Sequence, residues 1–210
     1  MHTTRSKFLI AILTVLLVLT VDQVLKIYIK THFMIGDQKD ITSWFKLHFV
    51  ENEGMAFGWK LGGSSGKLAL SLFRIVAVSF IGYYIVKLIR SNESRGLIIS
   101  MSMIFAGAIG NILDSIFYGK IFSASSPCDL AQLFPADGGY AGVLHGKVVD
   151  MLYFPLWEGF LPKWLGGHYF SFFDPVFNIA DSSISIGVFL ILLFQRRFFV
   201  AKKEAPALND

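Results

Sequence analysis

The stretch that decides the fold of this chain is Phe8-Leu-Ile-Ala-Ile-Leu-Thr-Val-Leu-Leu-Val-Leu-Thr-Val-Asp22-Gln-Val-Leu-Lys26-Ile-Tyr-Ile29. A helix needs about 20 mostly apolar residues to cross a bilayer, and this run is long enough. A cleaved signal peptide is disfavoured, because no small-x-small cleavage site follows and Asp22-Gln23 interrupts the apolar run. The stretch therefore predicts a transmembrane helix with polar side chains in its second half.

The composition of the whole chain agrees with a membrane protein. Of its 210 residues, 54% are apolar and 16% are charged, and the mean hydropathy is +0.57. Soluble domains carry about 25% charged residues, so this composition disfavours a water-soluble enzyme and excludes a disordered chain. The net charge of +4 is explained by the lysine and arginine residues that membrane proteins carry in their cytoplasmic loops. It does not indicate nucleic-acid binding. With one cysteine, no intramolecular disulfide and no cysteine metal cluster can form.

Three further apolar stretches are long enough to span a bilayer. We expect residues 1–210 to form a single all-α integral membrane domain with four transmembrane helices at about residues 8–29, 68–89, 97–118 and 176–199. Two long connections, at about residues 30–67 and 119–175, separate these spans.

Lysine and arginine side chains predict the orientation, because they gather on cytoplasmic loops. They flank the first span, crowd the short second-to-third connection and follow the fourth span: Arg5, Lys7, Lys87, Arg90, Arg95, Arg196, Arg197, Lys202 and Lys203. Both termini are therefore expected in the cytoplasm, and both long connections on the outer side of the membrane.

This orientation brings the polar residues of all four spans to one depth. They are Asp22 and Lys26 in the first span, Arg74 in the second, Asn111 and Asp114 in the third, and Asn178 and Asp181 in the fourth. An ionisable residue within a span costs free energy, so several in one layer indicate a shared polar site near the outer face.

Helical spacing groups these residues further. Asn178, Asp181, Ser182 and Ser185 lie on one helical face, and Gly107, Gly110, Asn111 and Asp114 lie on another. The glycines allow two helices to approach closely. Interhelical hydrogen bonding explains the serines well, but a carboxylate is an expensive way to hold two helices together.

The outer connections predict a small β-rich element. Residues 44–59 are rich in aromatic side chains with local alternation, which predicts short strands joined by a turn at residues 52–54, with Trp44, Phe45, Phe57 and Trp59 at the level of the lipid headgroups. Residues 119–145 read as an irregular loop, and residues 146–156 as a strand. Asp150 in this apolar strand is poorly solvated unless it has a partner.

Carboxylates are the side-chain groups in this polar layer that could catalyse a reaction. Neither a Gly-x-Ser-x-Gly elbow nor a zinc-ligand spacing occurs. Two aspartates that share one proton can hydrolyse an amide. From the residues alone, Asp181 pairs with Asp114. A proton-coupled transporter or channel stays an alternative, because intramembrane acids also relay protons, and so does a non-catalytic lipid-binding or assembly subunit.

Five motifs, in order along nearly the whole chain, resemble those of bacterial lipoprotein signal peptidases, the signal peptidase II type of intramembrane aspartyl protease. They are Asp22-Gln-Val-Leu-Lys26, Asn52-Glu-Gly54-Met-Ala-Phe-Gly58, Gly107-Ala-Ile-Gly-Asn111-Ile-Leu-Asp114, Gly146-Lys-Val-Val-Asp150 and Phe177-Asn178-Ile-Ala-Asp181.

The resemblance implies a role for each matched residue. Asp150 and Asp181 become the catalytic pair, which replaces the pairing of Asp181 with Asp114. The other matched residues would support the site or bind substrate: Asp22, Lys26, Asn52, Gly54, Gly107, Asn111, Asp114 and Asn178.

The sequence departs from the family pattern at two places. The family usually has arginine directly after the aspartate of Asn-x-x-Asp, and this chain has Ser115. Arg74 or Lys147 is the hypothetical replacement as the charge partner of Asp114. Residues 120–145 are longer than the family's usual link, and we expect a flexible extra loop over the outer face.

The resemblance implies the substrate and the location. The substrate would be a prolipoprotein whose cysteine already carries a diacylglyceryl group, cut just before that cysteine. The enzyme would be a monomer in the bacterial inner membrane, in contact with membrane lipids, with its site near the periplasmic face. It would need neither a metal nor another cofactor.

Overall fold

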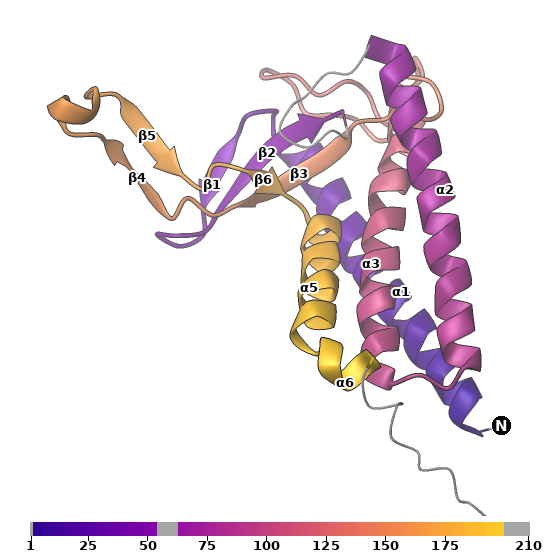
Figure 1. The fold of residues 1–210 in the computed structure, drawn as a ribbon. Helices are drawn as coiled ribbons and strands as arrows, with labels where there is room; N and C mark the ends of the chain where they lie inside the picture. The colour runs from indigo at the N-terminus through magenta and orange to yellow at the C-terminus, as the bar shows by residue number, and fades with distance from the viewer. Residues whose placement is uncertain (1, 54–62, 200–210) are drawn as a thin grey trace, which may run out of the picture.

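Three long helices, α1 (His2–His32), α2 (Gly63–Arg90) and α3 (Arg95–Leu113), lie side by side in the computed structural model, which describes residues 2–53 and 63–199 (Figure 1). A π-helical turn, η2 (Asp114–Tyr118), and a short α4 (Gly119–Ile121) extend α3. Within the described ranges, three helices are long and apolar enough to cross a membrane: Thr4–His32, Ser65–Arg90 and Arg95–Ile121. The first three predicted spans are therefore confirmed as such helices.

The fourth predicted span is wrong in its first part. Residues Val176–Phe177 form strand β6, and the helix α5 begins at Ile179 and ends at Leu193, followed by a short α6 (Gln195–Phe199). Asn178 is extended, and its side chain accepts a hydrogen bond from the backbone N–H of Asp181 as the N-cap of α5. At 1.5 Å per residue, the 15 residues of α5 rise about 22 Å, less than the roughly 30 Å hydrocarbon core of a bilayer.

The outer surface of the helices is apolar. Leu17 is 66% exposed on α1, Phe80 is 70% exposed on α2, and Phe189 is 61% exposed on α5. In water such a surface would be costly, whereas lipid chains solvate it as well as the protein interior does.

Within residues 2–199, the basic residues that predicted the cytoplasmic side lie at one end of the helices. The start of α1, the turn between α2 and α3, and α6 are found together there (Figure 1). Lys7 ties two of these parts, because its ammonium donates to Asn92 Oδ1 and to the Glu93 carbonyl, both at 2.6 Å.

A four-stranded antiparallel sheet lies at the opposite end, with the order β1 (Gln38–Asp40), β2 (Lys46–Asn52), β3 (Val148–Tyr153), β6. A β-rich element after the first helix is thus confirmed, as is a strand within residues 146–156. The predicted fold class was incomplete, however, because strands from the later connection build half of the sheet. The turn at residues 52–54 and the residues Gly54, Phe57 and Trp59 fall at least partly outside the described ranges.

A bulge in β2 decides which side chains share a face of the sheet. Leu47 pairs with Leu152 and Val50 pairs with Asp150, so three steps along β2 match two steps along β3. Because side chains alternate, one extra residue moves Asn52 to the same face as Asp150, and Glu51 to the other face.

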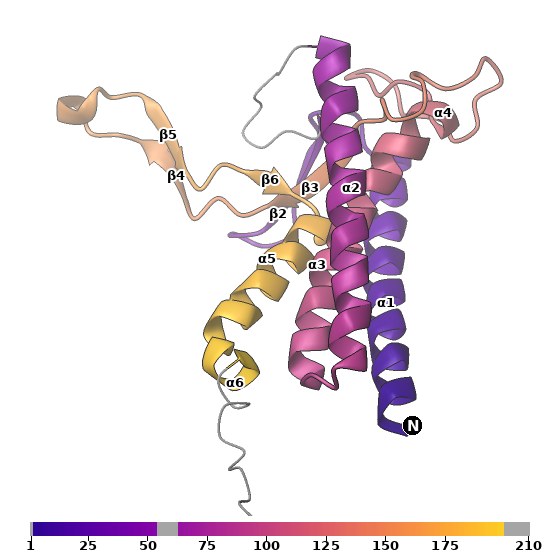
Figure 2. The ribbon, with the colours of Figure 1, turned by 45° about the vertical axis from the view of Figure 1, so that its right-hand side comes forward.

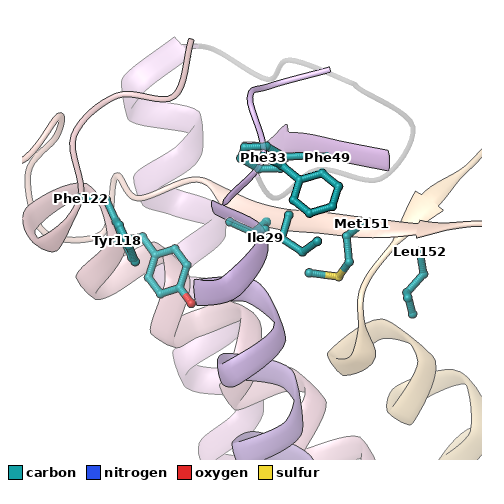
Figure 3. Packing of buried hydrophobic residues seen from close by; sticks show 8 residues of the cluster. Ile29, Phe33, Phe49, Tyr118, Phe122, Met151 and Leu152 are labelled. Atoms are coloured by element: carbon teal, nitrogen blue, oxygen red, sulfur yellow. The ribbon is translucent and has the colours of Figure 1, made fainter. Parts of the chain in front are cut away.

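The sheet is joined to the helices by a cluster of buried apolar side chains (Figure 3). Ile29 and Phe33 come from the end of α1, Phe49 from β2 and Met151 from β3. Phe122, which follows α4, is completely buried in the same cluster. The cluster fixes the height of the sheet above the bundle.

Residues 120–145 are irregular, as predicted, but the expectation of a flexible extra loop is wrong for its two flanks. The Ser126 carbonyl accepts from the Ile35 amide at 3.2 Å, and the Phe122 carbonyl accepts from the Tyr140 amide at 3.1 Å. The segment is therefore hydrogen-bonded to the residues that follow α1 and to its own start.

A two-stranded arm leaves the sheet between β3 and β6. It consists of β4 (Trp157–Phe160), a short 3₁₀ turn η3 (Lys163–Leu165) and β5 (Tyr169–Phe172). In two views the arm extends sideways, away from the helices (Figures 1 and 2).

Close packing of α3 on α5 depends on glycine. A Cβ atom at Gly107 would lie 2.2 Å from the Ala180 carbonyl oxygen, and one at Gly187 would lie 2.6 Å from the Ser100 carbonyl oxygen. The predicted close contact through the Gly107 face is therefore confirmed.

We expect Gly107→Ala to lower the free energy of unfolding in detergent by about 1–3 kcal/mol, because the added methyl group overpacks the α3–α5 contact. Gly142→Ala is the matched control, since the nearest atom to its Cβ, His145 Nδ1, is 4.0 Å away. Equal unfolding temperatures for the two variants would contradict this explanation of the packing.

Candidate active site

A buried lysine organises the polar layer between α1 and α3. The Lys26 ammonium lies 2.9 Å from Asp22 Oδ2 and 2.7 Å from Asp114 Oδ2, and all three side chains have no exposed surface. One ammonium between two carboxylates compensates much of the cost of burying the three charges. The predicted i, i+4 pair of Asp22 and Lys26 is therefore present, with Asp114 as its third member.

This arrangement corrects the hypothesis about the charge partner of Asp114. The partner in direct contact is Lys26. Lys147 pairs with Glu51 at 3.4 Å. Arg74 interacts electrostatically with Asp181, Asp150 and Asp114. Ser115 uses its hydroxyl differently, donating to the Asn111 carbonyl at 3.0 Å.

Asn111 links Lys26 to Asp181 through hydrogen bonds. The Lys26 ammonium donates to Asn111 Oδ1 at 3.0 Å, and this fixes the orientation of the Asn111 amide. Asn111 Nδ2 then donates to Asp181 Oδ1 at 2.8 Å. A residue of α1 thereby orients a carboxylate on the first turn of α5.

Asn178 bridges Asp181 and Asp150. Its Nδ2 donates to Asp150 Oδ1 at 2.7 Å, while its Oδ1 accepts from the Asp181 backbone N–H at 2.9 Å. The completely buried Asn178 side chain therefore connects strand β3 to the start of α5. The N-cap position explains why asparagine is suited to this place.

Asp150 lies in a nearly closed environment on β3, where 3% of its surface is exposed. Asn52 Nδ2 contacts its other oxygen at 3.3 Å. Burial and the nearby Asp181 carboxylate raise the pKa of Asp150 to about 7. Near neutral pH, one of the two aspartates can hold a proton while the other is ionised.

The two aspartates considered as partners of Asp181, which are Asp114 and Asp150, make different contacts. Asp114 Oδ1 accepts from Gln23 Nε2 at 2.9 Å, and Asp114 Oδ2 is engaged by Lys26. Asp150 and Asp181 instead share Asn178. Both carboxylate oxygens of Asp114 are thus engaged within the ion group of α1 and η2.

Two of the remaining predicted site residues, Asp22 and Gly107, lie at contacts between helices. Asp22 Oδ1 accepts from the Ala180 backbone N–H at 2.9 Å, which joins α1 to α5. Gly107 lies at the α3–α5 contact, and Gly54 lies outside the described residues. Gly146, from the β3 motif, passes so close to η2 that a Cβ atom would lie 2.1 Å from the Asp114 carbonyl oxygen.

Two contributors were missed from the sequence. Gln23 connects Asp22, Asp114 and the Tyr118 hydroxyl, and its polar side chain within an apolar span was the available signal. The second contributor is an ion cluster of Lys30, Glu51 and Ser125, in which Lys30 and Ser125 both bond Glu51 Oε1. Its members are distant in sequence and share no spacing pattern.

The ion cluster fixes the end of β2. Burial opposes ionisation of Glu51, but the charges and hydrogen bonds of its partners, Lys30 first, outweigh burial and hold the Glu51 pKa below its usual value. Because Glu51 directly precedes Asn52, the cluster also fixes the residue that contacts Asp150.

Comparison with known proteins identifies the family of this chain. The sequence model of the family described as signal peptidase (SPase) II matches residues 14–197. The chain belongs to the signal peptidase II family. A lipoprotein signal peptidase from Porphyromonas gingivalis is 56% identical over 183 residues, covering 85% of this chain and 79% of the relative. A lipoprotein signal peptidase from Amoebophilus asiaticus is 40% identical over 205 residues, covering 93% and 82%.

Two solved structures of bacterial membrane enzymes share this fold. A bacterial membrane enzyme determined by the in meso method at 1.9 Å resolution matches with a TM-score of 0.58 and 26% identity, covering 88% of this chain and 91% of that chain. A second such structure, at 2.3 Å resolution and 24% identity, has the same fold, with a TM-score of 0.58 and 93% of each chain covered.

As a signal peptidase II, the chain is an aspartic endopeptidase and a bacterial membrane protein. The transporter or channel alternative is not favoured by these matches. The resemblance drawn from the five motifs is confirmed.

Substitution of the buried lysine should be severe. Lys26→Met leaves two buried carboxylates without their cation, and we expect the free energy of unfolding to fall by about 3–5 kcal/mol. In a double-mutant cycle, Lys26→Met and Asp114→Asn should couple by at least about 0.5 kcal/mol. The control cycle pairs Lys147→Met with Asp114→Asn and should be additive. Coupling in the control cycle alone would contradict the assignment of Lys26 as the partner.

The raised pKa of Asp150 predicts a pH dependence of stability. The folded state holds the Asp150 proton more tightly than the unfolded chain, so the stabilisation present in acid is lost as pH rises through about 7. Between about pH 5 and pH 8, the free energy of unfolding of the parent protein should therefore fall. The fall should be about 3 kcal/mol smaller in Asp150→Asn, which has no carboxyl proton to lose.

Unfolding in detergent across this pH range would measure the effect, with Asp129→Asn as the control for an exposed aspartate. The control should follow the parent protein. Parallel curves for Asp150→Asn and the parent would contradict the buried, protonated state of Asp150.

Proposed function

We propose that this chain removes the signal peptide from prolipoproteins by cutting the peptide bond directly before a cysteine that carries a diacylglyceryl group. Family membership and relatives named lipoprotein signal peptidase support the reaction. The observation that carries the residue assignment is the hydrogen-bonded sequence from Asp150 through Asn178 and Asn111 to Asp181.

In the proposed mechanism, the two aspartates share one proton. Burial and the nearby Asp181 carboxylate raise the pKa of Asp150 to about 7, so we assign the shared proton to Asp150, and Asp181 accepts a proton from a water molecule. The water oxygen attacks the scissile carbonyl carbon while Asp150 protonates the carbonyl oxygen. The tetrahedral intermediate then collapses and the C–N bond breaks. The amine of the cysteine leaves with the proton from Asp181, and Asp150 takes back one hydroxyl proton as the new carboxyl group forms.

Asparagines keep the two carboxylates in these roles. Asn52 and Asn178 each donate to Asp150, and Asn111 donates to Asp181. Amides cannot ionise, so they orient the aspartates without competing for the shared proton. Asp22, Lys26 and Asp114 support the asparagines from below, and the loop that contains Gly54 would contact the substrate backbone.

The site depth suits a lipid-modified substrate. The acyl chains of the diacylglyceryl group would lie along the apolar helix surfaces, which would hold the scissile bond near the sheet. We propose four spans in a single 1–210 domain, with α5 and α6 together forming the fourth. Both termini would then be cytoplasmic and the aspartates near the periplasmic face of the inner membrane, in a monomer surrounded by membrane lipids.

The test is a gel-shift cleavage assay on a diacylated prolipoprotein in detergent. Asp150→Asn and Asp181→Asn should each lower the cleavage rate by about 10²–10⁴-fold, because each removes one proton-transfer group. Asp129→Asn, an exposed aspartate of the outer segment, is the matched control and should cut normally.

The assay also separates the alternatives. Full activity of a folded Asp150→Asn variant would return Asp114 to consideration as the partner of Asp181. Absence of cleavage by the parent protein together with proton flux in proteoliposomes would support a transporter.

A further inference from the structure

The arm formed by residues 157–172 exposes aromatic side chains that the catalytic site does not use. The exposed fractions are 47% for Trp157, 75% for Phe160, 80% for Trp164, 56% for Tyr169, 40% for Phe170 and 56% for Phe172. None of these residues belongs to the buried apolar clusters described for the chain.

Pairing within the arm leaves both of its faces apolar. Trp157 lies opposite Phe172, and Phe160 lies opposite Tyr169. Since side chains alternate along a strand, these two pairs point to opposite faces. Rings also pair within the arm, with Phe160 and Tyr169 at a centroid distance of 5.6 Å and Trp157 and Phe170 at 6.2 Å.

An arm of this kind is not stable in water by itself. A two-stranded hairpin needs a third strand or another packing surface. Contiguous exposed aromatic surface marks a site of contact with a protein, a ligand or a membrane.

The position of the arm selects the membrane as its partner. The arm leaves the sheet beside the start of α5 and runs sideways from the helices (Figures 1 and 2). α5 exposes Ile186 and Phe189 to lipid, so the arm projects over the lipid that surrounds α5 and not over other parts of the chain.

The composition of the arm matches the headgroup layer. Tryptophan and tyrosine concentrate at membrane–water interfaces, where an apolar ring and a polar N–H or O–H are both solvated. Lys163, exposed at the tip next to Trp164, adds an ammonium group suited to lipid phosphates.

We propose that residues 157–172 form an interfacial arm that lies in the headgroup layer of the outer leaflet and binds the phospholipid surface through its aromatic rings. β4 follows the strand that carries Asp150, and β5 leads through β6 to Asn178 and Asp181. Contact with lipid would therefore fix, at one depth, the two segments that hold the aspartates.

The test measures the depth of Trp164. A variant with Trp164 as its sole tryptophan (Trp44→Phe, Trp59→Phe and Trp157→Phe) is reconstituted into phosphatidylcholine–phosphatidylglycerol vesicles. The lipids carry bromines either close to the chain carbonyls or close to the chain ends. Fluorescence quenching should be at least about twofold stronger with the shallow bromines.

A second reporter calibrates the depth scale. Phe80, 70% exposed on α2, is replaced by tryptophan in a chain whose four native tryptophans are phenylalanine, and deep bromines should quench this reporter more strongly. If the multiple substitutions prevent folding, the difference in quenching between the parent protein and Trp164→Phe gives the same reading.

Three results would overturn the proposal. The first is an absence of lipid quenching with full access of aqueous acrylamide, which places the arm in water. The second is protection from acrylamide that disappears when the protein is diluted in lipid, which indicates a second copy of the chain. The third is stronger quenching by the deep bromines, which places the arm in the hydrocarbon.

This measurement is independent of catalysis. The same quenching is expected with the Asp181→Asn substitution added, so a failed cleavage assay and a failed quenching experiment contradict different proposals.

Discussion

The whole outer half of this membrane protein depends on one buried ammonium group. Lys26 lies between Asp22 and Asp114 without solvent, at 2.9 and 2.7 Å. Removing a charge from water costs several kcal/mol, and the ion group is stable only when each member is paired and hydrogen-bonded. Gln23 supplies the additional hydrogen bonds. Through Asp22 and the Ala180 amide the group also fixes the start of α5, so three helices meet at one point.

Amide side chains connect this ion group to the aspartates and hold the aspartates in their orientation. Lys26 fixes Asn111, which donates to Asp181, and Asn178 caps α5 while it donates to Asp150. The charged support and the proposed chemistry are thus separated by neutral groups. Such a separation lets the Asp114–Lys26 ion pair lie near an Asp150 whose pKa is about 7.

The sheet contributes the second half of the site by its register. The bulge in β2 places Asn52 beside Asp150 and turns Glu51 toward Lys30 and Ser125. One strand therefore contacts the site on one face and an ion cluster on the other. The outer segment that supplies Ser125 is part of this support. The same sheet leads into the aromatic arm, so the depth of the arm in the membrane and the geometry of the site are physically connected.

The sequence by itself determined the membrane class, three spans, the convergence of polar residues and the family, because apolar run length, helical spacing and ordered motifs are local properties. It did not determine the partner of Asp114, the start of α5 or the register that brings Asn52 beside Asp150. Those depend on contacts between segments far apart in the chain, where a bulge, an N-cap and buried ion pairs decide which groups meet. In a buried layer, a charged group pairs with the opposite charge that lies nearest to it, and only the tertiary structure sets the distance between the two groups.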